Sequence, residues 1–253
     1  MFLKYIFLLF LLINLTSCSS KKEPVYNYEG TFNIEKGGML IDAMSGEPSN
    51  LISMIAGDSA SSAISGNIFN KLIKYDKNLE LAPELADKWT ISDDQKTITF
   101  YLKRNLKWAD GHSLTSEDVL FTWKLVTDEK TRTPYGSDYK LVDKAEAPDP
   151  YTFRIHYTKA YAPALDSWAS LQILPKHILK DEDINQTFFS RKPTGSSYYK
   201  LTQWINGEKL TLEASPSSVM GEPNINQLTS RFIPDTSSQF LELIADNIDL
   251  MNI

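Results

Sequence analysis

Strict alternation of apolar and polar residues marks two stretches in the middle of the chain. Ile98, Phe100 and Leu102 alternate with polar or amphipathic neighbours over residues 97–102, and the same spacing of two recurs over residues 151–157. Because successive side chains of a strand point to opposite faces, this spacing predicts strands with one buried face. Other apolar runs predict strands at residues 37–42, 72–75 and 248–251, and a strand followed by a helix cap at residues 231–235.

Apolar or small residues recur at a spacing of three or four in other stretches, which predicts helices. These stretches are residues 60–68, 115–126, 161–171 and 240–244. Thr115 and Asp118 have the spacing of a capping box, in which each side chain satisfies a backbone N–H group of the first turn. Asp110-Gly111 predicts a turn before that helix, because glycine tolerates positive φ. Asn247 is predicted to end the last helix in the left-handed conformation.

The first residues combine one positive charge with an apolar run. Lys4 precedes an apolar stretch over residues 5–13, which is shorter than the roughly 20 residues that a membrane-spanning helix needs. The stretch is typical of a secretory signal peptide, here over residues 1–17. It ends in Leu15-Thr-Ser-Cys18, which resembles the lipobox of bacterial lipoproteins and implies a lipid-modified Cys18. The alternative is an incidental cysteine in an ordinary signal peptide.

The lipobox resemblance predicts where the protein is located. Residues 18–31 are polar and show no periodicity, so we expect a flexible tether behind the lipidated Cys18. The folded part would then be anchored to a membrane of the cell envelope, facing the periplasm or the exterior. Since Cys18 is the one cysteine in the sequence, an internal disulfide is excluded.

Composition and charge narrow the class of protein further. The chain has 253 residues, of which 42% are hydrophobic, so it can bury a core in one or two domains. Its formal net charge is −6, and the sequence has no block of basic residues. Because nucleic-acid binding needs clustered Lys and Arg, a nucleic-acid partner is not expected.

Several uncommon features follow one another in a fixed order over residues 81–123. They are Leu-Ala-Pro-Glu-Leu at 81–85, Trp108-Ala-Asp-Gly111, Leu114-Thr-Ser-Glu-Asp-Val119 and Phe121-Thr-Trp123. This order resembles the extracytoplasmic solute-binding proteins of family 5, the oligopeptide-, dipeptide- and nickel-binding components of ABC importers. Residues 173–177 and 195–204 resemble further segments of that family, although Ser197 and Tyr198 stand where glycine and proline are usual.

The resemblance implies an α/β fold of the periplasmic-binding-protein-like type II class, in which two lobes enclose a solute. Residues 32–253 resemble only the N-terminal part of a family member. We therefore expect a truncated or split protein that has the first lobe alone, with a mixed β-sheet and flanking helices. Strands without partners and an exposed apolar patch should make such a chain dimeric or aggregation-prone.

The implied function is capture of a peptide or similar small solute for the permease subunits of an ABC importer, without a cofactor. Glu47 and Ser49 are expected to contact the solute, because the family has a similar Glu-Pro loop at its cleft. Tyr135, Ser196 and Tyr198 are the other expected contacts. As plain chemistry, Gly-Glu-Pro is a turn, and a turn with no binding role is the alternative.

The sequence lacks the common motifs of enzymes. It has no Gly-x-Ser-x-Gly, P-loop or dinucleotide-binding pattern, so no catalytic residue is predicted. His112, His156 and His177 are scattered without helical pairing, so no metal site is predicted. Two alternatives stay open: a partner-binding or scaffold lipoprotein without a transport role, and a hydrolase that uses cleft carboxylates.

Overall fold

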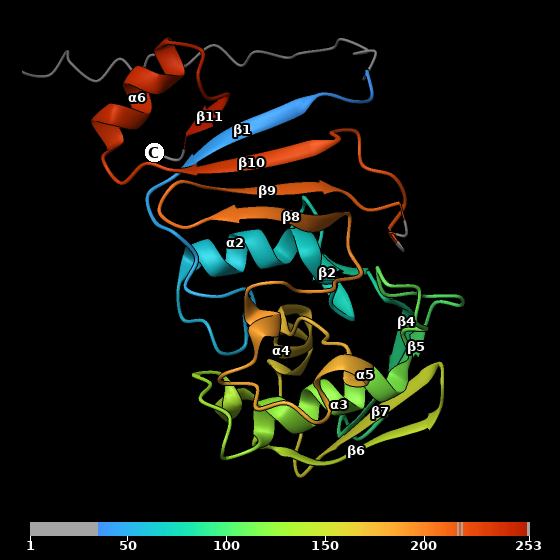
Figure 1. The fold of residues 1–253 in the computed structure, drawn as a ribbon. Coiled ribbons are helices and arrows are strands. Elements are labelled where there is room, and N and C mark those ends of the chain that lie inside the picture. The colour runs from blue at the N-terminus through green and yellow to red at the C-terminus, as the bar shows by residue number, and fades with distance from the viewer. Residues whose placement is uncertain (1–34, 217, 219, 252–253) are drawn as a thin grey trace, which may run out of the picture. The chain divides into compact units, whose positions relative to one another are not determined.

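The computed structural model describes residues 35–216, 218 and 220–251. The larger of its sheets contains β1 Met39–Met44, β8 Tyr199–Ile205, β9 Lys209–Ala214, β10 Gln227–Phe232 and β11 Leu250–Met251. The strands lie in the order β11-β1-β10-β9-β8 (Figure 1). β1 is parallel to both β10 and β11, whereas β8, β9 and β10 are antiparallel neighbours. The sheet is therefore mixed, as predicted.

A second sheet is antiparallel throughout. It contains β4 Ala86–Ile91, β5 Thr97–Leu102, β6 Val142–Asp149 and β7 Thr152–Tyr157, in the order β4-β5-β7-β6. Phe100 of β5 pairs directly with Phe153 of β7, and both side chains are fully buried. The two strands predicted from strict alternation are confirmed. A small two-stranded sheet consists of β2 Ile73–Tyr75 and β3 Leu81–Pro83.

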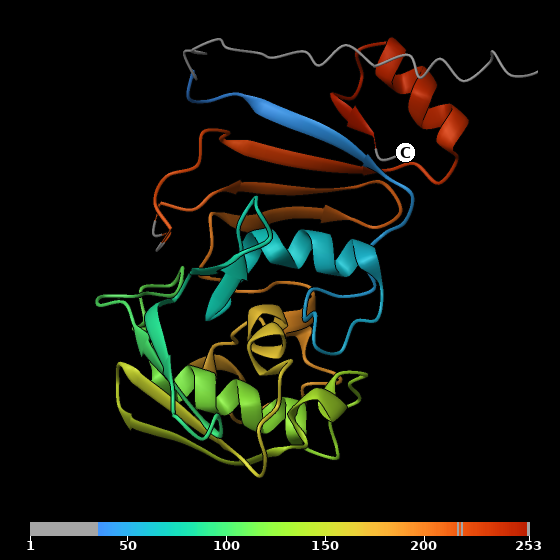
Figure 2. The ribbon, with the colours of Figure 1, turned by 180° about the vertical axis from the view of Figure 1, so that it is seen from behind.

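The helices connect these sheets. They are α2 Ser59–Ile68, α3 Ser116–Thr127, α4 Ala164–Ser170, α5 Lys176–Leu179 and α6 Thr236–Ile244. α2 packs against β8 of the larger sheet, and α3 packs against β6 and β7 of the second sheet. Figure 2 shows the same arrangement from behind, with α4 between α2 and α3 in both views. The capping box of α3 is confirmed, since Asp118 Oδ2 accepts from Thr115 N at 2.9 Å.

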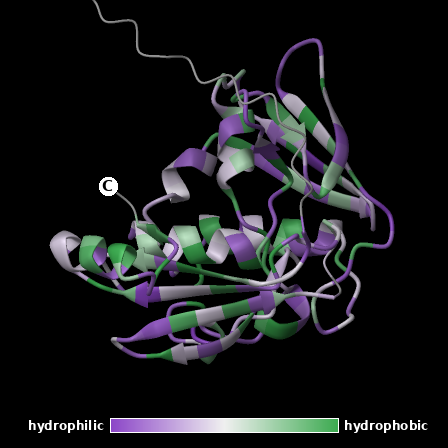
Figure 3. Cartoon of the chain, turned by 90° about the horizontal axis from the view of Figure 1, so that it is seen from above, coloured by the Kyte–Doolittle hydropathy of each residue, from purple (hydrophilic) through white to green (hydrophobic). Residues whose placement is uncertain are grey.

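A cluster of aromatic side chains lies at the centre of the buried core. Trp168 of α4 is fully buried and meets Phe153 edge-on, with ring centroids 5.1 Å apart. Its indole N–H donates to the Tyr157 hydroxyl at 2.9 Å, so the one polar atom of the ring is satisfied. Figure 3 colours the chain by hydropathy, and hydrophobic (green) and hydrophilic (purple) segments alternate along its strands and helices. The buried apolar residues of both sheets form one continuous core.

The last helix ends one residue earlier than the sequence predicts. Asp246, with φ 56°, adopts the left-handed conformation, so the prediction for Asn247 is wrong. Asn247 N instead donates to Glu242 O at 2.9 Å, and Asp246 N donates to Leu243 O at 3.2 Å. These bonds resemble a Schellman end, in which the left-handed residue directly follows the cap, here Ala245.

The apolar stripe of α6 faces solvent. Phe240, Leu241 and Ile244 are 54%, 66% and 64% exposed. Gln239 is the fully buried residue of this helix, and its amide donates to Ile233 O at 2.6 Å. Three large apolar side chains of α6 are therefore open to solvent, whereas the patch expected beside unpaired strands stays a prediction.

The N-terminal expectations concern residues that the structure does not describe. The signal peptide over residues 1–17, the lipidated Cys18 and the tether over residues 18–31 all lie outside the described residues. Among the residues that are described, no helix is both long and apolar enough to cross a membrane. Lipidation and anchoring stay predictions.

Candidate functional site

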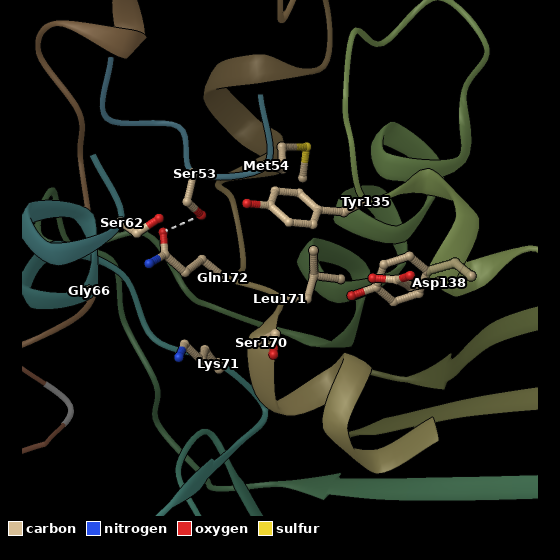
Figure 4. A pocket seen from close by; sticks show the side chains of 11 residues that line it. Ser53, Met54, Ser62, Gly66, Lys71, Tyr135, Asp138, Ser170, Leu171 and Gln172 are labelled. Atoms are coloured by element: carbon tan, nitrogen blue, oxygen red, sulfur yellow. Dashed lines mark hydrogen bonds between the residues drawn. The ribbon is translucent and has the colours of Figure 1, made fainter. Parts of the chain in front are cut away.

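A pocket of about 340 Å³ lies at the junction between the layers of the two sheets. Its walls are α2, the 3-10 helix η2 Gly136–Tyr139 and the end of α4. Figure 4 shows that its side chains come from segments far apart in the sequence. The lining residues are Ser53, Met54, Ser62, Gly66, Lys71, Tyr135, Asp138, Tyr139, Ser170, Leu171 and Gln172.

Hydrogen bonds fix one side of this pocket. Ser53 Oγ donates to Gln172 Oε1 at 2.8 Å, as drawn in Figure 4. Lys71 forms an isolated antiparallel bridge with Gln172, and Ile173 N donates to Asn70 O at 2.9 Å. These contacts join the segment after α2 to the segment after α4. The lining is therefore formed before any ligand binds, as in most small-molecule sites.

The lining combines opposite charges with aromatic and apolar surface. Lys71 and Asp138 lie on different sides of the pocket in Figure 4. Tyr135 is 40% exposed and extends its ring towards Met54. Leu171 adds apolar surface between the two charges. Such a lining suits an organic solute that carries both charged and apolar groups.

Tyr139 anchors the pocket and does not offer acid–base chemistry. Its hydroxyl donates to Ser167 O at 2.8 Å, which ties η2 to α4. Burial raises the pKa of Tyr139 far above its ordinary value, and the nearby Asp138 charge adds to this effect. The hydroxyl therefore stays protonated. The lining has neither His nor Cys, so it contains no nucleophile–base pair built on those residues.

Of the residues predicted to contact solute, Tyr135 lies in the pocket and Glu47 does not. Glu47 accepts hydrogen bonds from Trp204 Nε1 at 2.7 Å and from Gly207 N at 2.8 Å. The Arg191 guanidinium stacks on the Trp204 ring at 3.7 Å and lies 3.8 Å from Glu47. Glu47 thus ties the loop after β1 to the turn between β8 and β9, and a ligand contact by Glu47 stays a prediction.

Ser49 also has a structural partner. Its hydroxyl donates to Asp58 Oδ2 at 2.6 Å, and Asp58 caps α2 by accepting from Ser61 N at 2.7 Å. Burial acts to raise the pKa of Asp58, but the hydrogen bonds from Ser49 and Ser61 outweigh it and hold the pKa below its usual value. Contact between Ser49 and a solute stays untested.

Ser196 belongs to a buried polar network beneath the pocket. Its hydroxyl donates to Asn70 Oδ1 at 2.8 Å, and Asn70 Nδ2 donates to Glu84 Oε1 at 2.9 Å. Burial raises the pKa of Glu84, although the Asn70 hydrogen bond opposes it. Tyr198 is partly buried against the core. Neither Ser196 nor Tyr198 lines the pocket, and their contact with a solute remains a prediction.

No sequence pattern marks Lys71, Asp138 or Gln172 as pocket residues. Lys71 and Gln172 meet through an isolated bridge outside the named strands, so no periodic pattern marks either residue. Asp138 lies in a short 3-10 helix next to Tyr135, one of the residues predicted to contact the solute. Its proximity to Tyr135 in the sequence is the one signal that points to Asp138.

The three histidines are scattered along the sequence, and the fold brings two of them, His112 and His177, together. The imidazole rings of His112 and His177 stack with centroids 4.1 Å apart, and both lie beside Asp110. His156 instead interacts with Glu146 and Thr97 on the second sheet. Folding brings the loop of His112 next to α5, a contact that cannot be predicted from the spacing of the two residues in the sequence.

Comparison with known proteins identifies the relatives of this chain. Residues 80–253 match the family described as bacterial extracellular solute-binding proteins, family 5 Middle. The oligopeptide-binding protein AppA of Bacillus subtilis is 31% identical over 255 residues, covering 97% of this chain and 46% of AppA. The probable D,D-dipeptide-binding periplasmic protein DdpA of Escherichia coli is 27% identical, covering 84% of this chain and 42% of DdpA.

The fold agrees with these sequence relationships. The structure of Bacillus subtilis AppA in complex with a nonapeptide matches with a TM-score of 0.83 and 28% identity, covering 87% of this chain and 44% of AppA. The substrate-binding protein CtaP of Listeria monocytogenes matches with a TM-score of 0.81 and 29% identity. The predicted periplasmic-binding-protein-like α/β fold is confirmed. The chain spans about half the length of the curated relatives that it matches.

Proposed function

The chain belongs to family 5 of the bacterial extracellular solute-binding proteins, and on this basis we propose that it captures a peptide or similar small solute for an ABC importer. The observation that carries the proposal is the preformed pocket beside Tyr135. Its volume of about 340 Å³ falls at the lower end of the usual range for small-molecule sites. In this proposal the protein is a binding component and not an enzyme.

The charges of the pocket support a zwitterionic solute. Lys71 is placed to attract a carboxylate, and Asp138 is placed to attract an ammonium group on a different side. A short peptide carries both groups, separated by apolar or polar side chains. Tyr135 and Leu171 would then cover the middle of such a ligand.

We further propose that this pocket is one wall of a cleft that a second lobe closes. Closure would exclude water from the charged contacts, and the closed form of the protein would present the surface that docks to the permease. The relatives are about twice as long as this chain, which supports a second wall. A single wall leaves the ligand half solvated, so we expect dissociation constants of roughly 1 mM, about 4 kcal/mol.

The test is calorimetric titration of the chain with a library of short peptides. The tightest ligand is then titrated against Lys71→Met and Tyr135→Ala, each of which should weaken binding by roughly 5-fold or more. Lys74→Met is the matched control, because Lys74 lies on β2 outside the pocket lining. Equal weakening by all three variants would refute this pocket as the site. No binding at roughly 10 mM peptide would refute peptide capture itself.

Membrane anchoring is the second part of the proposal. Cys18 would carry lipid, because the apolar run over residues 5–13 ends in a lipobox-like sequence. Cys18→Ala should release the protein from membranes or leave its signal peptide uncut. Mass spectrometry of the membrane-extracted protein measures the modification directly. An unmodified Cys18 thiol would contradict lipidation without affecting the pocket.

A partner-binding lipoprotein is the second candidate function, and the exposed apolar stripe of α6 favours it. Phe240, Leu241 and Ile244 together offer an apolar surface of the kind that marks interaction sites. The second candidate replaces the first if two results occur together. Lys71→Met and Tyr135→Ala would leave peptide binding unchanged, and substitutions in α6 would abolish binding to a membrane partner.

A further inference from the structure

Asp110, His112 and His177 bring three metal-ligating groups to one point on the surface, outside the pocket already described. His177 Nε2 lies 2.7 Å from Asp110 Oδ2, and His112 Nδ1 lies 3.3 Å from Asp110 Oδ1. The three ligand atoms all lie within 4.8 Å of one another. We propose that these residues bind a divalent transition-metal cation of the zinc type.

The loop that carries Asp110 and His112 has a fixed backbone. Trp108 N donates to His112 O at 2.9 Å, and Gly111 closes the turn with φ +90°. Asp110 Oδ1 also accepts from His112 N at 3.0 Å, which holds the carboxylate against its own turn. Ala109 N donates to Gly195 O at 2.8 Å and secures the loop to the rest of the fold. Two ligands are therefore held close together before a metal binds.

The third ligand is placed by α5. Pro175 precedes this helix, and Lys176 N donates to the buried Asp118 Oδ1 at 2.9 Å. His177 follows directly, with its ring 6.4 Å from that of the buried Trp108. The backbones on both sides of the cluster are thus anchored by buried groups. The His112 side chain is 63% exposed, so it can adjust to a metal ion by rotation.

The chemistry of the three groups suits an imidazole-binding metal. Two imidazoles and one carboxylate form a ligand set that Zn²⁺ accepts, with Zn–N distances of roughly 2.0–2.1 Å and remaining positions filled by water. The Asp110 carboxylate supplies the oxygen ligand of this set.

The positive charge next to His177 in the sequence is offset. Lys176 is the basic group on the same helix turn, and its Nζ lies 2.8 Å from Glu117 Oε2, which offsets its charge. Asp118, beneath the turn, adds a further acidic group. The stacked rings of His112 and His177 have centroids 4.1 Å apart, so both imidazoles lie near the same point.

The three histidines of the chain provide the experiment with its own control. The full chain with the Cys18→Ala substitution and without a histidine tag is freed of metal by chelation and titrated with Zn²⁺. The C2–H NMR signals of His112 and His177 should shift together, whereas the His156 signal should not move. The same titration by calorimetry should give one site per chain.

Variants test the ligand assignment. His112→Gln and His177→Gln should each weaken Zn²⁺ binding by at least roughly 10-fold, and His156→Gln should leave the affinity unchanged. The His112 side chain is 63% exposed, so its substitution should leave the melting temperature of the metal-free protein unchanged.

The proposal is overturned by several results. One is the absence of any histidine shift at roughly 1 mM Zn²⁺, well above typical site affinities. Another is an equal response of the His156 signal, or unchanged affinity in His112→Gln and His177→Gln. In those cases the cluster only holds the loop of Asp110 against α5 through hydrogen bonds. Peptide binding at the pocket is measured separately, so either proposal can fail alone.

Discussion

Substitution of Gly195 by alanine should destabilise the fold at the point where the two sheets meet. A Cβ atom built on Gly195 would lie 2.0 Å from Ile68 O and 2.6 Å from Ile68 Cγ2. Ile68 is fully buried at the end of α2, so neither atom can move into solvent. Relief of the clash therefore needs the two backbones to separate by roughly 1 Å or more.

The magnitude follows from the contacts that this separation breaks. Ser196 N and Ser197 N both donate to Ile68 O at 3.0 Å, and neither bond survives such a shift. Two lost hydrogen bonds cost about 2 kcal/mol, and overpacking adds about 1–3 kcal/mol. The free energy of unfolding should fall by about 4 kcal/mol, which corresponds to a decrease in melting temperature of roughly 10 °C.

Thermal unfolding followed by circular dichroism measures this effect, and Gly66→Ala is its matched control. A Cβ atom on Gly66 meets no atom within 4 Å, and the residue lies within α2. Alanine there should stabilise the helix by up to about 1 kcal/mol. The two glycine substitutions should therefore change the melting temperature in opposite directions. A Gly195→Ala protein that melts within about 1 °C of the parent would refute the reasoning.

Three further predictions concern other contacts of the structure. The folded-state pKa of Asp58 is lowered, so the stability that its carboxylate contributes is fully present above the unfolded-state value of about pH 4 and is lost as the pH falls from there through the lower folded-state pKa. Asp58→Asn should therefore flatten the decline in melting temperature between about pH 5 and pH 2, and parallel curves would contradict this. Glu47→Ala removes the acceptor of the Trp204 and Gly207 N–H groups, so the free energy of unfolding should fall by about 2 kcal/mol and the tryptophan fluorescence should change. A Glu47→Ala protein that is fully stable but no longer binds peptide would show instead that Glu47 contacts the ligand. The exposed stripe of α6 should cause the protein to self-associate, and Leu241→Lys should reduce this association. Sedimentation velocity measures it, and a monomeric parent protein would contradict the prediction.

Local patterns allowed much of the fold to be predicted. Strict alternation placed β5 and β7, and the capping box placed the start of α3, because these signals depend only on neighbours in the chain. The end of α6 was misplaced by one residue, since Asp and Asn both tolerate the left-handed conformation and Asp246 comes first. The position of a helix end can therefore depend on which of two neighbouring residues, both able to adopt the left-handed conformation, comes first.

Contacts between distant segments could not be predicted in the same way. The pocket depends on the bridge between Lys71 and Gln172, and the metal cluster depends on Asp110 meeting α5. The orientation of α6 also follows from tertiary contacts, because the buried amide of Gln239 binds Ile233 O while the apolar stripe stays exposed. Each arrangement is set by packing that a single sequence does not reveal.

The parallel pairing of β1 with β10 has a consequence for the order of events in folding. Ser230 of β10 donates to Asp42 of β1 at 2.7 Å across 188 positions of the chain. β4 to β7 can form from nearby segments, whereas β1 cannot pair with β10 until the chain has been synthesised as far as Phe232. Such high contact order slows folding, because the entropy of closing a long loop is lost before the pairing stabilises it. A chain that stays unfolded for longer remains competent to be threaded through a translocation channel.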